Sequence, residues 1–402
     1  MNAPSGTPQS TVDRRASGGG SAVRVVFHYH LALEFPEEIS RMAELFPDVH
    51  FDVVESDEEF HAALPEATVI VAAPQPSTTL DRSLSAAGSP RRLQAHIIPF
   101  AGVNRVPLSW YRQHGVLLAS SHGNADAVAE RAVALMYAAA GRVVEFDNDL
   151  RQGRWHRRDD HVRPFDYWRT LTGSRIAILG TGAIGCRIAA LVAPLIGGRA
   201  LAGDRAPGGS GGAGELVGLR RNRGRSAEEE HGGARVVTAE AVAAGEDEAR
   251  HPERLFGRLT TRVEEALAGA DVVFLTLPLT EDTRGTITGD LLGATNQATL
   301  VNVSRAELIP EEDLYASLTD GTLYAAGLDV WYRYPSPFFD EGITAFPSRL
   351  PFHHLRNVVM SPHAASHSRE GKRSQLVGAL AHLEEFLKTG GLSRAVNVRR
   401  GY

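Results

Sequence analysis

The sequence predicts an α/β protein of two domains, each built on a parallel sheet. At 402 residues, the chain exceeds what one hydrophobic core usually serves. Short apolar runs, such as residues 23–27 and 69–73, alternate with segments rich in Ala, Leu and Glu, as strands and helices alternate in an open α/β sheet. A second and stronger series of such runs starts at Arg175 and ends near residues 358–360.

The composition argues against several classes of protein. Hydrophobic residues make up 43% and charged residues 22%, as in ordinary globular proteins. The formal net charge of -6 argues against a general attraction to nucleic acid or anionic lipid. The single cysteine, Cys186, cannot form an internal disulfide, and no run approaches the roughly 18 apolar residues that a membrane helix needs. We expect a cytoplasmic protein without a metal site and without nucleic-acid or membrane partners.

The first domain follows a short polar tail. Residues 1–22 are rich in Ser, Gly, Thr and Pro, and we expect them to form a disordered tail. The strands expected at 23–27 and 69–73, with helices between them, indicate a flavodoxin-like domain over residues 23–124.

Two helical segments flank the second domain. Residues 125–141 combine high helix propensity with apolar side chains on nearly all faces, so we expect this helix to lie between domains or subunits. Residues 366–388 form a second expected helix, which ends before Gly390 and Gly391. Its apolar stripe consists of Leu376, Leu380, Leu383 and Leu387. We expect this helix to pack on the first domain, which then comprises residues 23–124 and 365–402, with the second domain at 125–364.

A stretch rich in Gly, Arg and Glu interrupts the second domain at residues 207–257. This composition is typical of loops and solvated helix surfaces rather than of a core. We therefore expect a surface insertion over these residues.

A glycine-rich turn follows the first strand of the second domain, expected at residues 175–179. The sequence is Gly180-Thr181-Gly182-Ala183-Ile184-Gly185, and it leads into a helix. Gly180 permits the tight turn, Gly182 lets the backbone approach a pyrophosphate, and Gly185 lets the helix pack on the strand. With the N–H groups at the helix start, to which Ala183 and Ile184 belong, the pattern predicts a Rossmann domain that binds a dinucleotide.

Asp204 is the candidate for recognition of the adenosine ribose. It ends the next apolar run, residues 200–204, and lies about 20 residues beyond the first glycine. A carboxylate at this position accepts hydrogen bonds from both ribose hydroxyls. A carboxylate repels a 2′-phosphate, so NAD(H) is favoured over NADP(H). The neighbouring Arg205 could bind such a phosphate, and NADP(H) therefore stays the alternative.

Several motifs occur in a specific order along the chain. They include the sequences that begin at Asn124, Gly153, Gly180, Ala270, Leu277, Val301, Gly327 and Ser361. In this order the sequence resembles the D-isomer-specific 2-hydroxyacid dehydrogenases, with gaps, from about residue 23 to residue 402. The resemblance implies a substrate domain completed by the last helix, an NAD-binding Rossmann domain, a small anionic 2-oxo or 2-hydroxy acid in the cleft, and a homodimer formed through the cofactor domains.

The resemblance also assigns catalytic roles. Arg305 matches the residue that binds the substrate carboxylate, which suits the planar and permanently charged guanidinium. His363 matches the residue that exchanges the hydroxyl proton, because an imidazole titrates near neutral pH. During reduction, His363 would protonate the 2-oxo oxygen while carbon 2 accepts hydride from the nicotinamide.

Further residues match binding positions of the family. The loop formed by Ala101, Gly102 and Val103 matches the one whose N–H groups grip the carboxylate, and Asn124 matches a substrate-binding asparagine of the related formate dehydrogenases. Asp329 matches the residue near the nicotinamide carboxamide. The remaining cofactor contacts implied by the resemblance are Val303, Leu277, Pro278 and Thr283.

One position departs from the family pattern. The glutamate that usually pairs with the histidine is replaced by Tyr334. A glutamate stabilises the protonated imidazole, whereas a neutral phenol only orients the ring, so we expect a lower pKa for His363 than in typical members. Asp340 or Glu341 could supply the missing charge.

Other functions stay open. The departure at Tyr334, the Asp-Val-Trp sequence that ends at Trp331, and Asn124 are also similar to formate dehydrogenases. His28, His30 and nearby arginines could suit a substrate bearing phosphate or phosphonate. A third alternative is a regulator that binds NAD(H) without turnover; an enzyme would consume NADH with a 2-oxo acid, and a sensor would not.

Overall fold

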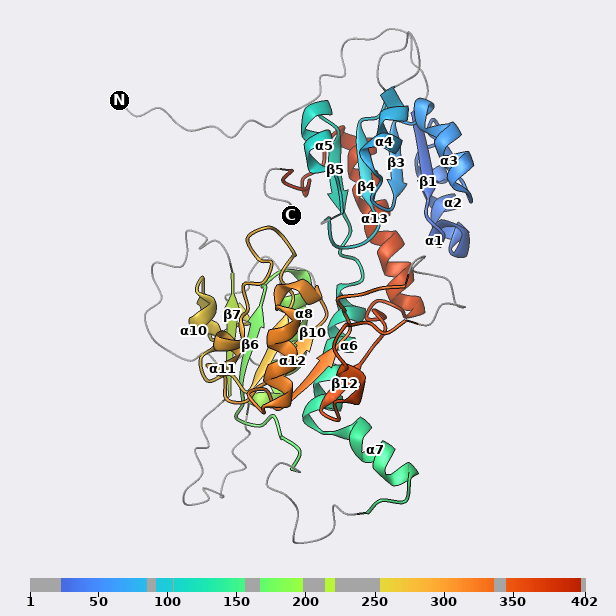
Figure 1. Ribbon diagram of the computed structural model, residues 1–402. Coiled ribbons are helices and arrows are strands. Elements are labelled where there is room, and N and C mark those ends of the chain that lie inside the picture. Colours follow the sequence, from blue (N-terminus) through green and yellow to red (C-terminus); the bar gives the residue numbers. More distant parts are fainter. Residues whose placement is uncertain are drawn as a thin grey trace, which may run out of the picture. The chain divides into compact units, whose positions relative to one another are not determined.

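The computed structural model describes residues 23–84, 92–103, 105–155, 167–197, 214–220, 254–335 and 345–398. The chain divides into two compact units (Figure 1). Unit 1 comprises residues 1–124 and 368–402, and unit 2 comprises residues 125–367. Each unit is an α/β structure with one parallel sheet, as the alternation of apolar runs and helical segments predicts.

Unit 1 contains a five-stranded parallel sheet in the order β2-β1-β3-β4-β5, which is the flavodoxin-like order. The strands are β1 (Arg24–His28), β2 (His50–Val53), β3 (Val69–Ala72), β4 (Ala95–Ile98) and β5 (Leu117–Ser120). The helices are α1 (Leu31–Glu34), α2 (Pro36–Leu45), α3 (Asp57–Ala63), α4 (Ser77–Leu80), α5 (Leu108–His114) and α13 (Arg369–Thr389). Short 3-10 turns lie at Leu64–Glu66 and Asp81–Leu84.

Alternation along the strands divides the core of unit 1 between the two faces of the sheet. Val25 and Phe27 of β1 pack with α1, α2 and α13, whereas Val26 packs with α3 and α5 on the other face. Ser368 caps the start of α13, because its hydroxyl accepts a hydrogen bond of 2.9 Å from the Gly371 N–H, and Gly390 caps its end. Leu376, Leu380 and Leu383 of α13 are buried in this core and Leu387 packs against it, so the helix packs on the sheet of unit 1.

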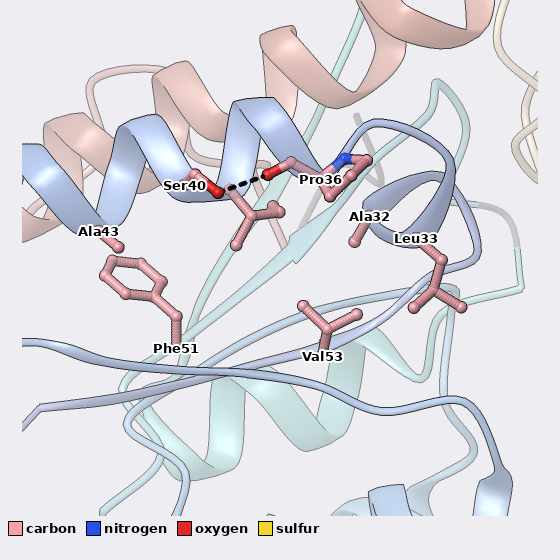
Figure 2. Close-up of a pocket in the computed structure, with 8 residues that line it drawn as sticks. Ala32, Leu33, Pro36, Ser40, Ala43, Phe51 and Val53 are labelled. Carbon is pink, nitrogen blue, oxygen red and sulfur yellow. Dashed lines mark hydrogen bonds between the residues drawn. The ribbon is translucent and has the colours of Figure 1, made fainter.

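A shallow apolar groove lies on unit 1 between α1, α2 and the edge strand β2 (Figure 2). Leu33, Pro36, Phe51 and Val53 contribute to its walls, and the Ser40 hydroxyl donates a hydrogen bond of 3.0 Å to the Pro36 carbonyl. None of the site residues expected from the sequence lines this groove.

Unit 2 contains a seven-stranded parallel sheet in the order β12-β11-β10-β9-β6-β7-β8. The strands are β6 (Arg175–Leu179), β7 (Glu215–Leu219), β8 (Arg258–Thr260), β9 (Val272–Leu275), β10 (Thr299–Asn302), β11 (Ala325–Leu328) and β12 (Val358–Met360). The helices are α6 (Ala125–Ala140), α7 (Val143–Arg151), α8 (Ala183–Ile196), α10 (Val263–Leu267), α11 (Gly289–Gly293) and α12 (Glu311–Thr319). Short 3-10 turns lie at Ala306–Leu308 and Phe352–His354.

The order of these strands is that of a Rossmann domain with one additional edge strand. Helices α6 and α8 cover one face of the sheet, and α10, α11 and α12 contribute to the core on the other face. The chain reverses its direction of winding between β6 and β9, which are neighbours in the sheet. Ligands of open α/β sheets bind at such a switch point, outside the carboxyl ends of the strands.

The predicted surface insertion over residues 207–257 needs a correction. Within it, residues 215–219 form β7, which pairs with both β6 and β8, and Leu216 and Val217 are buried. This part therefore belongs to the core of the sheet. The sequence did not indicate it, because the Gly-rich and Arg-rich segments on either side obscure a strand of only five residues. Most of the remaining insertion, and the apolar run at 200–204 that we expected to form this strand, lie outside the described residues.

Candidate active site

The glycine turn between β6 and α8 has the geometry that a bound pyrophosphate requires. Gly180 has a φ of +116°, and a Cβ built there would lie 2.8 Å from the Thr276 carbonyl carbon. A Cβ on Gly185 would lie 1.9 Å from the Gly180 carbonyl oxygen, so this glycine permits the close contact of helix and turn. A Cβ on Gly182 would meet no protein atom within 4 Å. The space beside Gly182 is therefore open to a ligand.

The start of α8 completes this cradle. Gly182 is the N-cap residue of the helix, and Ala183 and Ile184 form its first turn, where backbone N–H groups have no partner within the helix. The side chain of Thr276, after β9, donates a hydrogen bond of 2.7 Å to the Gly180 carbonyl and so ties the turn to the switch point. These residues fit a dinucleotide, whose pyrophosphate the helix N-terminus would stabilise.

The segment after β9 forms a compact turn beside the glycine turn. The Thr283 hydroxyl donates a hydrogen bond of 2.7 Å to the Pro278 carbonyl, and Leu277 is half-buried. The Ser304 hydroxyl donates to the Leu277 carbonyl and links this turn to the end of β10. Leu277, Pro278 and Thr283 therefore belong to one hydrogen-bonded turn, which the Thr283 hydroxyl stabilises from within.

A buried asparagine positions Arg305 after β10. The side-chain amide of Asn302 donates a hydrogen bond of 3.0 Å to the Arg305 carbonyl, and its oxygen accepts one of 3.0 Å from the Ser304 N–H. The Arg305 guanidinium in turn donates to the Ser304 carbonyl over 2.7 Å. Val303, between them, is buried. Asn302 is not among the site residues expected from the sequence, although an asparagine at a strand end is a typical start of an Asx turn.

The carboxylate of Asp329 holds the loop that carries His363. Asp329 is fully buried, and its two oxygens accept hydrogen bonds from the Ser361 hydroxyl and from the N–H groups of Ala364 and Ala365, the last two over 2.9 Å. His363 has a φ of +57°, a left-handed conformation that non-glycine residues seldom adopt. Both oxygens of Asp329 thus stabilise a strained loop. This is a positioning role that the sequence did not indicate.

Tyr334 lies beside the histidine, at the position where the family pattern has a glutamate. The ring centroids of Tyr334 and His363 are 5.5 Å apart with an angle of 46° between the planes. The Tyr334 hydroxyl accepts a hydrogen bond of 3.1 Å from the Trp331 N–H. Burial raises the pKa of Tyr334, and the nearby charge of Arg305 only partly opposes this, so the phenol is neutral at physiological pH.

The expected catalytic residues therefore gather at one edge of the sheet in unit 2. Arg305 follows β10, Tyr334 follows β11 and His363 follows β12, while the glycine turn follows β6. Because all seven strands are parallel, these segments lie at their carboxyl ends. Asp204, Arg205, Asp340 and Glu341 lie outside the described residues.

The remaining site residues expected from the sequence belong to unit 1. Ala101, Gly102 and Val103 follow the end of β4, and Gly102 has a φ of +102°, which favours glycine. Asn124 ends the segment after β5 and is buried, and its side-chain oxygen has no hydrogen-bond partner among the described residues. In the part of the chain that the structure describes, no group of three or more His, Cys, Asp or Glu side chains could hold a metal ion. No helix of this part is long and apolar enough to cross a membrane.

The fold of unit 2 and the glycine turn at the carboxyl end of β6 define a dinucleotide-binding protein of the Rossmann type. Residues 133–208 and 232–365 match the model of the NAD-binding domain of the D-isomer specific 2-hydroxyacid dehydrogenases. The chain belongs to this family of NAD(P)-dependent oxidoreductases.

Similar proteins include two curated relatives. The chain is 28% identical to the glyoxylate reductase of Korarchaeum cryptofilum over 282 residues, which cover 70% of this chain and 68% of the relative. It is 30% identical to the glyoxylate/hydroxypyruvate reductase B of Yersinia pestis over 261 residues, which cover 64% and 63%. A solved glyoxylate/hydroxypyruvate reductase of Sinorhizobium meliloti has the same fold, with a TM-score of 0.63, 19% identity and coverage of 95% of this chain and 98% of that one.

Substitutions in the glycine turn should affect dinucleotide binding and thermal stability independently of each other. Gly182→Val should leave the thermal unfolding midpoint nearly unchanged, because its Cβ meets no protein atom, yet it should abolish dinucleotide binding by filling the cradle. Gly185→Ala should instead lower the midpoint, because its Cβ would clash with the Gly180 carbonyl. Calorimetry and quenching of protein fluorescence by NADH or NADPH would measure both effects. Undiminished binding by a folded Gly182→Val protein would contradict this reading of the turn.

Proposed function

We propose that this protein interconverts a small 2-oxo acid and its D-2-hydroxy acid, with Arg305 binding the substrate carboxylate and His363 exchanging the hydroxyl proton. The observation that carries the proposal is the assembly of Arg305, Tyr334 and His363 at the edge of the sheet that also holds the glycine turn. The relatives named as glyoxylate and hydroxypyruvate reductases support small 2-oxo acids as the substrate class.

Arg305 supplies the positive charge of the proposed site. Its own carbonyl and that of Ser304 are both engaged, so the segment has little freedom and the guanidinium is held beside the strand end. A guanidinium fixed in this way binds a carboxylate by two parallel hydrogen bonds and stabilises negative charge on the neighbouring oxygen. When a cofactor is bound, its nicotinamide supplies the hydride for reduction and accepts it in oxidation.

His363 moves the proton in this mechanism. In reduction its imidazolium donates a proton to the 2-oxo oxygen, and in oxidation the neutral ring removes the proton from the 2-hydroxyl. Asp329 holds the loop, and the ring of Tyr334 packs beside the imidazole, so the orientation of the ring is fixed by its neighbours. A neutral phenol orients the ring without adding the negative charge of a glutamate.

Unit 1 contributes the remaining residues of the proposal. The backbone N–H groups at Ala101, Gly102 and Val103 are proposed to bind the substrate carboxylate, and the Asn124 amide to bind the substrate. The buried side-chain oxygen of Asn124 supports this role, because a buried acceptor without a donor is costly unless a ligand or water satisfies it.

Replacing Arg305 should remove turnover but not dinucleotide binding. With Arg305→Ala we expect kcat/KM to fall by at least about 100-fold, because the carboxylate and developing oxyanion lose their charged partner. NADH and NADPH consumption would be followed with glyoxylate, pyruvate, hydroxypyruvate, phenylpyruvate, 2-oxoglutarate and phosphonopyruvate, and the reverse reaction with formate. Arg333→Ala, an exposed arginine near Tyr334, is the matched control.

The outcomes of this assay separate the candidate functions. Turnover of a 2-oxo acid that survives Arg305→Ala would contradict the proposed role of Arg305. Turnover of formate alone would establish the formate dehydrogenase alternative. Cofactor binding without consumption of any substrate would indicate a sensor.

Tyr334 predicts the pH dependence of reduction. Because His363 must be protonated to act as an acid, the rate of reduction falls as the pH rises. A carboxylate in place of the neutral phenol favours the imidazolium, so Tyr334→Glu should move this fall upward by about 1 pH unit. Tyr334→Phe should leave it in place, because it changes no charge. An identical pH profile of kcat for the wild type and Tyr334→Glu would show that this position does not influence the proton donor.

We further propose that the protein is a homodimer formed through unit 2. Helix α7 extends away from the sheet of its unit in Figure 1. Val143 and Leu150, seven residues apart and so on one side of the helix, are 57% and 50% exposed. Trp155, just after the helix, is 62% exposed. Large apolar side chains gathered on a protruding helix are typical of an interaction surface.

A charge on this side of α7 should separate the subunits. Leu150→Asp is expected to halve the mass measured by light scattering during gel filtration, because burying a carboxylate without a partner is costly. Asn148→Asp is the matched control, since Asn148 is exposed on the opposite side of α7 and receives the same charge. A Leu150→Asp protein with the wild-type dimer mass would place the interface elsewhere.

A further inference from the structure

The strand beside β6 ends at an arginine. β7 finishes at Leu219, and Arg220 follows it. In Rossmann domains the side chain at the end of this second strand meets the adenosine ribose, and its charge decides between NAD(H) and NADP(H). We propose that Arg220 binds the 2′-phosphate of NADP(H) and makes this form the preferred cofactor. The inference rests on the dinucleotide site of the proposed function and names the cofactor that it takes.

Hydrogen bonds on both sides fix the backbone around Arg220. Leu219 lies in register with Leu179 of β6, and its carbonyl accepts a hydrogen bond of 3.2 Å from the Gly180 N–H. On the other side, the Arg220 N–H donates a hydrogen bond of 2.9 Å to the carbonyl of Thr260 in β8. The glycine turn and Arg220 are therefore joined through Leu219, and the sheet holds Arg220 at the level where the turn begins.

The alternation of side chains along β7 places Arg220 on the face that carries the glycine turn. A Cβ on Gly218 would lie 2.7 Å from the Thr181 methyl carbon, so Gly218 faces the turn. Leu219 points to the opposite face, where it joins the core that contains α10. Because side chains alternate between the faces of a strand, Arg220 is directed to the same side as Gly218. Its guanidinium thus belongs to the side on which the dinucleotide cradle lies.

The charges around the end of β7 favour a phosphate. Arg220 is half-buried and forms no ion pair within the described residues. The nearby carboxylate of Glu265 is engaged, since it pairs with Arg258 and Arg262 and accepts a hydrogen bond of 2.7 Å from the Thr260 hydroxyl. A guanidinium binds phosphate oxygens bidentately, whereas it cannot accept hydrogen bonds from the two ribose hydroxyls of NAD.

This assignment differs from the preference for NAD(H) drawn from Asp204. That preference assumed that the second strand ends at residue 204, about 20 residues after the first glycine. The strand that pairs with β6 is β7, which ends at Leu219. Arg220 therefore occupies the position that the proposal places next to the adenosine ribose.

Binding measurements with Arg220→Ala test the proposal. We expect the wild type to bind NADPH at least about tenfold more tightly than NADH, and adenosine 2′,5′-bisphosphate more tightly than AMP. Arg220→Ala should remove this preference by weakening the two phosphorylated ligands and leaving NADH and AMP unchanged. Arg258→Ala, which removes a neighbouring arginine already paired with Glu265, should retain the preference.

Two results would overturn the proposal. One is equal or tighter binding of NADH by the wild type, especially if Asp204→Asn then weakens NADH. The other is a preference for NADPH that survives Arg220→Ala. None of these measurements needs turnover. A protein that prefers NADPH but reduces no 2-oxo acid would therefore contradict the proposed function and leave the assignment of Arg220 intact. A protein that reduces 2-oxo acids but prefers NADH would fail only this inference.

Discussion

Parallel pairing of the strands in unit 2 is the constraint on which the candidate site depends. Each of the seven strands enters the sheet from the same side, so the segment after every strand emerges at one edge. The glycine turn, Arg305, Tyr334 and His363 are far apart in the sequence, yet each lies in the segment that follows a strand. The switch point between β6 and β9 opens this edge to a ligand. The sheet thus brings the parts together, and the loops only adjust them.

Two buried polar side chains make that adjustment. Asn302 and Asp329 are almost fully inaccessible to solvent, and each satisfies backbone groups of a loop at the sheet edge. These hydrogen bonds stabilise the loops because they are buried: a buried loop N–H without a partner costs about 1–3 kcal/mol of free energy. The Asp329 carboxylate accepts three hydrogen bonds and can therefore maintain His363 at a positive φ. Catalytic side chains on loops obtain their rigidity from such partners.

Much of this arrangement was predictable, and the exceptions have physical causes. The strand and helix around Gly180, the leucine stripe of α13 and the proximity of Tyr334 to His363 follow from periodicity and from the order of motifs. The supporting role of Asp329 was missed, because hydrogen bonds between segments distant in the sequence leave no local pattern. β7 was missed for a different reason: the strand is short, and neighbouring glycines and arginines dominate the composition of any window that contains it.

The tyrosine beside His363 has consequences for the charge of the site. Its half-buried phenol is neutral, so the surroundings of Arg305 are one unit of charge more positive than with a glutamate at the same position. A substrate carboxylate bound to Arg305 would bring negative charge close to the imidazole. Opposite charges within about 4–6 Å favour the charged form of a titratable group. In the proposed mechanism, the bound substrate would thus favour the protonated form of His363. Substrate binding and proton uptake would then be coupled more strongly than where a glutamate already supplies the charge.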